Sequence, residues 1–174
     1  MIKFFDLQRQ DKILHNIILK DIKKSLNKCD FILGSKVIEF EKKFAKFCKV
    51  KYAVGCGNGT DALTIALKAL NLPKESEVII PAMTYYSTAF AVLNAGLKPI
   101  LVDIGKNDPT LSIKELKNKI NTRTKVIIPV HLYGSVSNLN PIKKMISKKK
   151  IIIIDDCSQA HGAYESLNNR IIKI

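Results

Sequence analysis

Apolar residues recur at helical spacing over the first quarter of the chain and gather into short blocks over the rest. Residues 11–28 place Ile or Leu at positions 13, 14, 17, 18, 22 and 26, which form one face of a helix. Apolar residues at 37, 40, 44 and 47 predict a second helix over 36–48. Beyond it the pattern predicts strands at 52–54, 77–81, 98–103, 125–130 and 150–156, with helices at 60–70, 86–95, 112–120 and 140–149.

The predicted strands are mostly unbroken runs of Val and Ile, such as VIIPV at 126–130 and IIII at 151–154. Strands of this kind, separated by helices, are typical of a parallel sheet that is buried on both faces. We therefore expect an α/β fold with a mostly parallel central sheet, helices on both faces, and two helices before it. Ligands bind beyond the carboxyl ends of the strands in such sheets, so the segments that follow the strands are the candidate sites.

The segment GCGNGTDAL at 55–63 follows a predicted strand and opens a predicted helix. Glycines allow close approach of a ligand, and the N–H groups at a helix start attract anions, so the segment can hold a phosphate. A simple tight turn with Thr60 as the N-cap is the alternative. A dinucleotide-binding motif would need a third glycine where Thr60 stands, and the Lys of a Walker loop is absent.

Two carboxylates, Asp155 and Asp156, follow the apolar strand in IIIIDDCSQAHG at 151–162. A carboxylate at such a place is costly unless it has a partner. It can cap the next segment, bind a metal, or pair with a protonated ring nitrogen such as that of pyridoxal phosphate. Tyr85 and Tyr86, in PAMTYY after another strand, offer rings for stacking but could equally be core residues.

The chain carries 29 Lys and Arg residues against 15 Asp and Glu, a net charge of +14. Nucleic-acid recognition favours the planar Arg side chain, yet only Arg9, Arg123 and Arg170 are Arg. The lysines are scattered over predicted helices, so we interpret the charge as a solvated basic surface and expect no nucleic-acid partner. No run approaches the ~18 apolar residues of a membrane span, and we expect no membrane partner.

The four cysteines show no CxxC pairing and no metal-like spacing with the histidines. The N-terminal segment MIKFFDLQRQDK lacks the apolar core of a secretion signal. These features favour a cytoplasmic protein with reduced cysteines and no metal.

Several segments in order resemble the DegT/StrS family of sugar aminotransferases: GNGTDALTIALKAL, EVIIPAMTYYSTAFAVLNAG, KPILVDI, TRTKVIIPVHLYG and IIIIDDCSQAHGA. The resemblance covers residues from about 4 to 164. It implies the large domain of the aspartate-aminotransferase fold and a pyridoxal 5'-phosphate cofactor. It also implies transamination of a nucleotide-linked keto sugar in amino-sugar and polysaccharide biosynthesis, with glutamate as the expected amino donor and a homodimer at full length.

The resemblance also implies roles for five residues in the cofactor site. Gly59 and Thr60 match the turn that binds the cofactor phosphate, and Tyr85 matches the aromatic residue that stacks on the ring. Asp156 matches the partner of the ring nitrogen, and Gln159 matches the group that hydrogen-bonds the ring hydroxyl. Asp155 stands where relatives usually have Glu, and no role is assigned to it. His131 and His161 lie in family-like motifs near the site, but each could equally be a structural residue.

The family's Schiff-base lysine lies in an FSF…K…GEGG stretch that would follow Ile174, so no catalytic lysine is assigned here. We expect an N-terminal helical segment at 1–35, part of the cofactor-binding large domain at 36–174, and no C-terminal small domain. Two alternatives stay open. Some relatives replace the lysine with His and dehydrate the sugar, and the 174 residues alone could be a non-catalytic remnant or interaction module.

Overall fold

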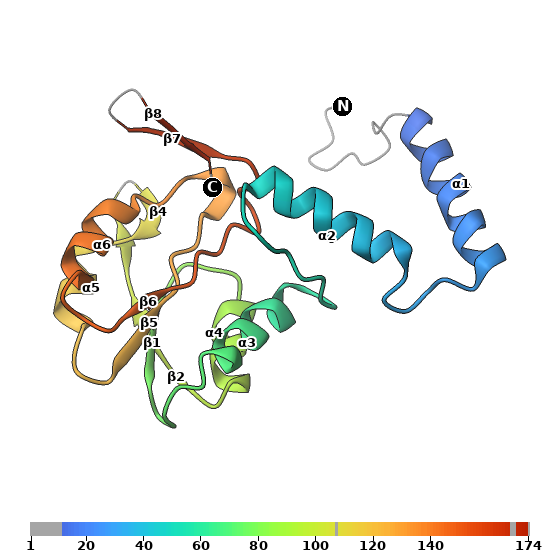
Figure 1. Ribbon diagram of the computed structural model, residues 1–174. Helices are drawn as coiled ribbons and strands as arrows, with labels where there is room; N and C mark the ends of the chain where they lie inside the picture. The colour runs from blue at the N-terminus through green and yellow to red at the C-terminus, as the bar shows by residue number, and fades with distance from the viewer. Residues whose placement is uncertain (1–11, 107, 168–169, 174) are drawn as a thin grey trace, which may run out of the picture. The chain divides into compact units, whose positions relative to one another are not determined.

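A computed structural model describes residues 12–106, 108–167 and 170–173 (Figure 1). The chain divides into two compact units, Met1–Gly55 and Cys56–Ile174, each of which is described by itself. The expected domain boundary at residue 36 lies inside the first unit, and the proposed division into domains stays a prediction.

The first unit contains the two predicted N-terminal helices, α1 (Lys12–Lys28) and α2 (Ser35–Cys48). Between them, the Asp30 carboxylate accepts hydrogen bonds from the backbone N–H of Ser35, at 3.1 Å, and from its hydroxyl. The predicted strand at 52–54 is wrong, because these residues form no regular structure and have no partner strand among the described residues. The segment GCGNGT therefore follows an irregular stretch of chain.

The second unit is built on a four-stranded sheet in the order β2-β1-β5-β6, and every pair in it is parallel. Its strands are β1 (Glu77–Pro81), β2 (Lys98–Val102), β5 (Thr124–Ile127) and β6 (Ile152–Ile153). The helices that accompany them are α3 (Gly59–Ala69), α4 (Ser87–Asn94), α5 (Ile113–Lys119) and α6 (Leu139–Ile146). The predicted parallel α/β sheet is confirmed.

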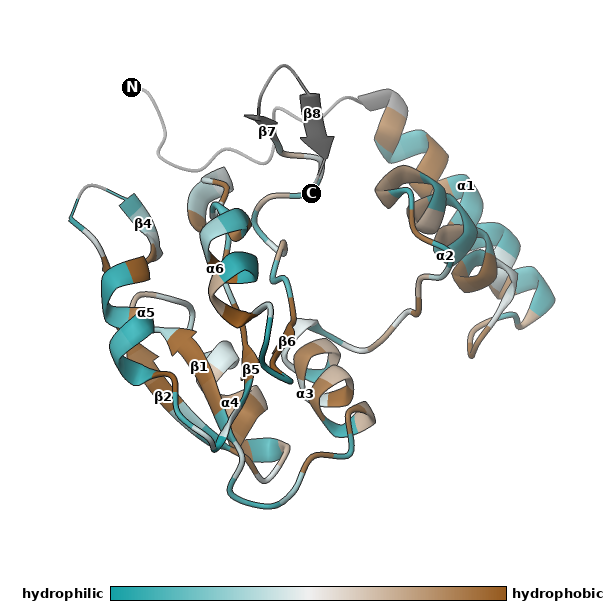
Figure 2. Cartoon of the chain, turned by 60° about the vertical axis from the view of Figure 1, so that its left-hand side comes forward, coloured by the Kyte–Doolittle hydropathy of each residue, from teal (hydrophilic) through white to brown (hydrophobic). Residues whose placement is uncertain are grey.

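Helices cover both faces of this sheet, as expected. One face packs against α3 and α4 through Leu67, Val78, Ile80, Val92 and Val126. The other face packs against α5 and α6 through Ile79, Leu116, Ile127, Ile142 and Ile146. Each Val, Ile or Leu that is fully buried in this way stabilises the fold by about 1.5–3 kcal/mol. Figure 2 shows β1 and β5 as hydrophobic strands, whereas α5 and α6 carry hydrophilic residues on their outer sides.

The chain leaves the two central strands in opposite directions. From β1 it passes through α4 to β2 on one side, and from β5 it passes through α6 to β6 on the other. A parallel sheet opens a crevice beyond the carboxyl ends of two strands whose connections diverge in this way. The fold therefore predicts a ligand site beyond the ends of β1 and β5.

Other elements differ from the sequence prediction. The last sheet strand was expected at 150–156, but only β6 pairs regularly, followed by an isolated parallel bridge between Val130 and Asp156. Two hairpins were not predicted: β3 (Ile104–Gly105) with β4 (Asp108–Leu111), and β7 (Tyr164–Leu167) with β8 (Arg170–Lys173). A short 3₁₀ turn, η2 (Leu132–Gly134), follows β5.

Candidate functional site

A cleft of about 400 Å³ lies at the place that the sheet topology predicts. The start of α3, the segment from β1 into α4, and the ends of the β5 and β6 segments each contribute to its lining. The lining residues are Asn58, Gly59, Thr60, Thr84, Tyr85, Tyr86, Ser87, Thr88, Val130, Asp156, Ser158 and Gln159. Among these described residues there is one carboxylate and no basic side chain.

The start of α3 presents two N–H groups that can bind an anion. Asn58, not Thr60, is the N-cap: its Oδ1 accepts a hydrogen bond from the Asp61 N–H at 2.9 Å, and its Nδ2 donates to Asp61 Oδ2 at 2.9 Å. The interpretation of Thr60 as the cap is therefore wrong. In the described part of the chain no acceptor is recorded for the N–H groups of Gly59 and Thr60. Because such groups and the helix dipole favour negative charge, this helix start can hold a phosphate.

Glycine at position 59 is not required by the fold. Apart from its chain neighbours and the backbone of its own helix, a Cβ at Gly59 would meet no atom within 4 Å. Glycine costs helix stability relative to alanine, and no packing contact offsets that cost here. A side chain at this position would therefore extend into open space beside a residue that lines the cleft.

Tyr85 and Tyr86 lie at the rim of the cleft and are not core residues. The two residues are 59% and 61% exposed, and their ring centroids are 4.3 Å apart. The Tyr86 ring also contacts the Phe90 ring edge-on, with the two centroids 5.6 Å apart. Aromatic pairs favour this geometry, and the contact helps to orient the Tyr86 ring. Hydrogen bonding with the Tyr86 side chain raises the pKa of Tyr85 above its usual value.

Asp156 and Gln159 enter the cleft from the segment after β6. Asp156 is 9% exposed, and its Oδ1 accepts hydrogen bonds from the N–H of Ser158 at 3.1 Å and from the Ser158 hydroxyl. The Oε1 atom of Gln159 accepts a hydrogen bond from the Tyr133 N–H at 2.9 Å. The amide nitrogen of Gln159 thereby remains as the donor that the side chain can offer to a ligand.

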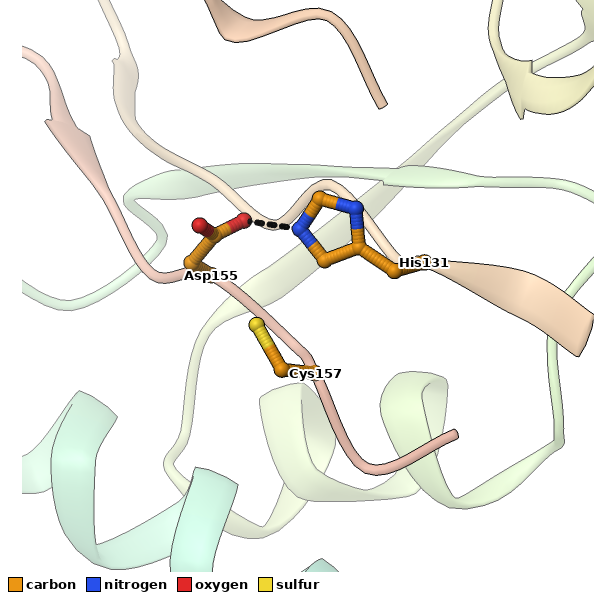
Figure 3. A group of neighbouring side chains, drawn as sticks. All are labelled: His131, Asp155 and Cys157. Atoms are coloured by element: carbon orange, nitrogen blue, oxygen red, sulfur yellow. Dashed lines mark hydrogen bonds and ion pairs between the residues drawn. The ribbon is translucent and has the colours of Figure 1, made fainter. Parts of the chain in front are cut away.

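His131, Asp155 and Cys157 form a second group, and none of the three is among the residues that line the cleft (Figure 3). Their side-chain donor atoms lie within 4.8 Å of one another, as in a possible metal site. The Ser137 N–H, however, donates to Nδ1 of His131 at 2.8 Å, so the ring proton must lie on Nε2. That proton points to Asp155 Oδ1 at 2.7 Å and occupies the lone pair that a metal would need. The contacts favour a hydrogen-bonded pair, and the expectation of no metal stays a prediction.

All five residues singled out in the sequence for a cofactor site line the same cleft. Sequence reasoning missed the neighbouring hydroxyl groups: Thr84 Oγ1 lies 3.0 Å from Thr88 Oγ1, and Ser158 bonds Asp156. Ser158 could have been found, because a Ser two residues after an Asp commonly closes a local turn. His161, which lies in the same motif, is not among the lining residues that the structure describes.

In the described part of the chain, no helix combines the length and apolar character that crossing a membrane requires. The cysteines, all of them described, form no disulfide bond.

Comparison with known proteins gives consistent results for sequence and structure. Residues 12–170 match the DegT/DnrJ/EryC1/StrS aminotransferase family. A UDP-2-acetamido-2-deoxy-3-oxo-D-glucuronate aminotransferase from Pseudomonas aeruginosa is 40% identical over 94% of this chain and 45% of its own length. This chain also superposes on the crystal structure of S. venezuelae DesV in complex with a ketimine intermediate, with a TM-score of 0.91 and 32% sequence identity. The match covers 98% of this chain and 46% of DesV.

A dehydratase is also similar. The structure of GDP-4-keto-6-deoxymannose-3-dehydratase with a trapped PLP-glutamate geminal diamine gives a TM-score of 0.79 at 32% identity, over 87% of this chain and 40% of that one. The chain thus spans about half the length of the relatives that it matches. Together these matches confirm the expected fold, the large domain of the aspartate-aminotransferase type, over the portion that the chain covers. The chain belongs to the DegT/DnrJ/EryC1/StrS aminotransferase family.

Proposed function

We propose that this chain forms the pyridoxal 5'-phosphate site of an aminotransferase that acts on a nucleotide-linked keto sugar. The observation that carries the proposal is the convergence of Gly59, Thr60, Tyr85, Asp156 and Gln159 on one cleft. These residues come from three separate segments of the chain, and their donor and acceptor groups match the parts of the cofactor one by one.

The start of α3 would hold the phosphate group. The N–H groups of Gly59 and Thr60 and the Thr60 hydroxyl are hydrogen-bond donors at the positive end of a helix dipole. Because the described lining has no basic side chain, these donors would supply most of the phosphate contacts made by this part of the protein. Asn58 supports them indirectly, since its side chain satisfies the N–H of Asp61 and leaves the other two for the ligand.

The rest of the cleft would orient the ring. Tyr85 would stack on the ring face, and the Gln159 amide would donate to the ring hydroxyl. The nearly buried Asp156 carboxylate would keep the proton on the ring nitrogen, because a carboxylate favours a cation beside it and burial strengthens that attraction. When bound, the cofactor supplies an electron sink for reactions at the carbon attached to nitrogen.

The substrate class follows from the relatives. The P. aeruginosa enzyme is an aminotransferase of a UDP-linked oxo sugar, and a glutamate adduct is present in the similar dehydratase. We propose the same substrate class here, within polysaccharide or other amino-sugar biosynthesis, and glutamate as the amino donor. None of the described residues that line the cleft is a lysine, so the Schiff-base lysine would come from outside this chain segment.

Dehydration of the sugar is the second candidate function, and the similarity to the GDP-sugar dehydratase supports it. The residue that separates the two reactions is a Lys or His in a stretch that would follow residue 174. The five cleft residues serve both reactions equally, because both need a phosphate anchor and a protonated ring.

We also propose that the complete protein is a homodimer in the cytoplasm. In the first unit, α1 and the turn after it expose apolar side chains around a groove of about 410 Å³, lined by Ile17, Ile18, Asp21, Ile22, Ser25, Leu26, Phe31 and Lys36. Contiguous apolar surface of this kind marks an interaction site, and a second copy would cover it. The absence of disulfides among the described cysteines agrees with a reducing compartment.

A chimera tests the proposed reaction. The 174 residues are joined to the remaining part of the P. aeruginosa relative and supplied with pyridoxal phosphate, glutamate and a UDP-linked keto sugar. We expect a visible absorption band and formation of the amino sugar, and loss of amino-sugar formation after Asp156→Ala. The 174-residue chain alone is expected to give no turnover. A well-folded chimera without the band would contradict the assignment.

A further inference from the structure

The segment after β6 is fixed to the segment after β5 by a set of hydrogen bonds. The Asp156 N–H donates to the Pro129 carbonyl at 3.0 Å, and the His131 N–H donates to the Asp156 carbonyl at 3.0 Å. The Tyr133 N–H donates to Gln159 Oε1 at 2.9 Å. The chain from 155 to 159 therefore takes its position from the loop at 129–133.

The side chains of His131 and Asp155 add the only ion-pair-type contact recorded between these two segments in the described part of the chain. His131 is fully buried, whereas Asp155 is 31% exposed at its side chain. The Ser137 N–H fixes the ring from the far side, so Nε2 donates to Asp155 Oδ1 at 2.7 Å in one defined orientation. Charge-assisted hydrogen bonds of this kind are among the stronger ones in proteins.

Alternation along the segment connects this pair to the cleft. Neighbouring side chains of an extended segment point to opposite sides. Asp155 and Cys157 lie on the His131 side in Figure 3, and Asp156, between them, lines the cleft. A rotation of the segment that released Asp155 from His131 would turn the Asp156 carboxylate away from the cleft.

We propose that His131 and Asp155 are positioning residues that hold the Asp156 carboxylate and the Gln159 amide at their places in the cleft. Neither residue lines the cleft, so they act through the segment and not on the ligand. The proposal rests on the proposed function for its consequence, because correct placement of Asp156 decides whether the ring nitrogen of the cofactor keeps its proton.

Two substitutions of His131 separate its two hydrogen bonds. In His131→Asn the amide takes the place of Nδ1, so it keeps the contact with Ser137 and loses Asp155. In His131→Gln the amide takes the place of Nε2, so it keeps Asp155 and loses Ser137. At the partly exposed partner, Asp155→Ala removes the acceptor without leaving a cavity in the core, and Asp155→Asn retains an acceptor oxygen.

The first readout needs no ligand. Amide hydrogen exchange is measured on the 174-residue chain at Asp156, His131 and Tyr133, with Ile128, whose N–H bonds the Ile79 carbonyl, as the internal control. We expect His131→Asn and Asp155→Ala to speed exchange at the three amides by roughly tenfold, because local opening becomes easier. Exchange at Ile128 should not change, and His131→Gln and Asp155→Asn should stay close to wild type.

The second readout is binding of pyridoxamine 5'-phosphate, whose amine cannot form a Schiff base with the many lysines of this chain. We expect roughly tenfold weaker binding to His131→Asn and Asp155→Ala. The pH at which the bound ring nitrogen loses its proton, read from the ultraviolet spectrum, should fall by about one unit.

The outcomes are distinguishable. Wild-type exchange in all four variants would overturn the positioning role, and so would equal damage by His131→Asn and His131→Gln. A wild-type chain that binds no pyridoxamine phosphate would count against the proposed function, while the exchange rates would still decide whether the pair holds the segment.

Discussion

Glu77→Gln is expected to lower the free energy of unfolding by about 2 kcal/mol at neutral pH. Glu77 opens β1 and is 2% exposed, and its carboxylate accepts hydrogen bonds from Asn121 Nδ2 and Arg123 Nε, each at 2.7 Å. Each hydrogen bond to a charged group contributes about 1.5–3 kcal/mol. Glutamine keeps one acceptor oxygen but turns an amide group toward the other donor, so one bond is lost. The Arg123 side chain is 67% exposed, which screens its charge and keeps the loss at the lower end of this range.

The effect depends on pH in a defined direction. The hydrogen bonds from Asn121 and Arg123 hold the pKa of Glu77 below its usual value. A carboxyl group with a lowered pKa in the folded state stabilises the protein above its unfolded pKa, and the contribution is lost as the pH falls through the folded pKa. The difference between the wild type and Glu77→Gln should therefore be complete at pH ~7 and shrink below about pH 4.

Urea denaturation followed by circular dichroism measures this difference at several pH values. Glu75→Gln is the matched control, because Glu75 is exposed and lies two residues earlier, and it should leave stability unchanged. Equal destabilisation by Glu77→Gln at neutral and acidic pH, or none at neutral pH, would refute the reasoning.

Three further predictions concern the cleft and the first unit. Tyr85→Leu should weaken pyridoxamine phosphate binding by roughly tenfold in equilibrium dialysis, whereas Tyr85→Phe keeps the ring and should bind like the wild type. Gly59→Ala should leave stability unchanged or raise it by up to about 1 kcal/mol in thermal melts, because nothing blocks a Cβ there, yet it should weaken binding of the phosphate. Light scattering should show that the 174-residue chain associates more strongly as salt is raised, because salt screens the repulsion from its net charge of +14. Ile18→Glu in the apolar groove of the first unit should suppress this association. A monomer at every salt concentration would contradict the prediction.

The sheet and its helices could be predicted because their sequence signals are local and strong. The run at 77–81 is apolar throughout, and the strand it forms is buried at every position. The short apolar stretch at 52–54 gave the same signal, but a strand also needs a neighbour to pair with, which local sequence does not supply. The cap of α3 failed for a related reason: Asn58 and Thr60 are both good capping residues, and the reciprocal bonds between Asn58 and Asp61 decide between them.

The general place of the site was also predictable, because parallel strands bring their carboxyl ends to one edge of the sheet. The contact between His131 and Asp155 was not, since it joins residues 24 positions apart through the pairing of the β5 and β6 segments. The same holds for the bond from Tyr133 to Gln159. Motif similarity indicated five side chains that line one cleft, whereas the packing of the two segments decides how Asp156 and Gln159 are held there.

The most direct test of the central claim, that the cleft binds the cofactor, is a titration of the ¹⁵N-labelled 174-residue chain with pyridoxamine 5'-phosphate, followed by NMR. We expect the largest shifts at the Gly59 and Thr60 amides and smaller ones at Tyr85 and Gln159. In Asp156→Ala the shifts at Tyr85 and Gln159 should disappear, because the ring contacts are lost, whereas those at Gly59 and Thr60 should remain, because the phosphate contacts are kept. Shifts confined to the lysine-rich surface around Lys148–Lys150, with Gly59 and Thr60 unmoved, would contradict it.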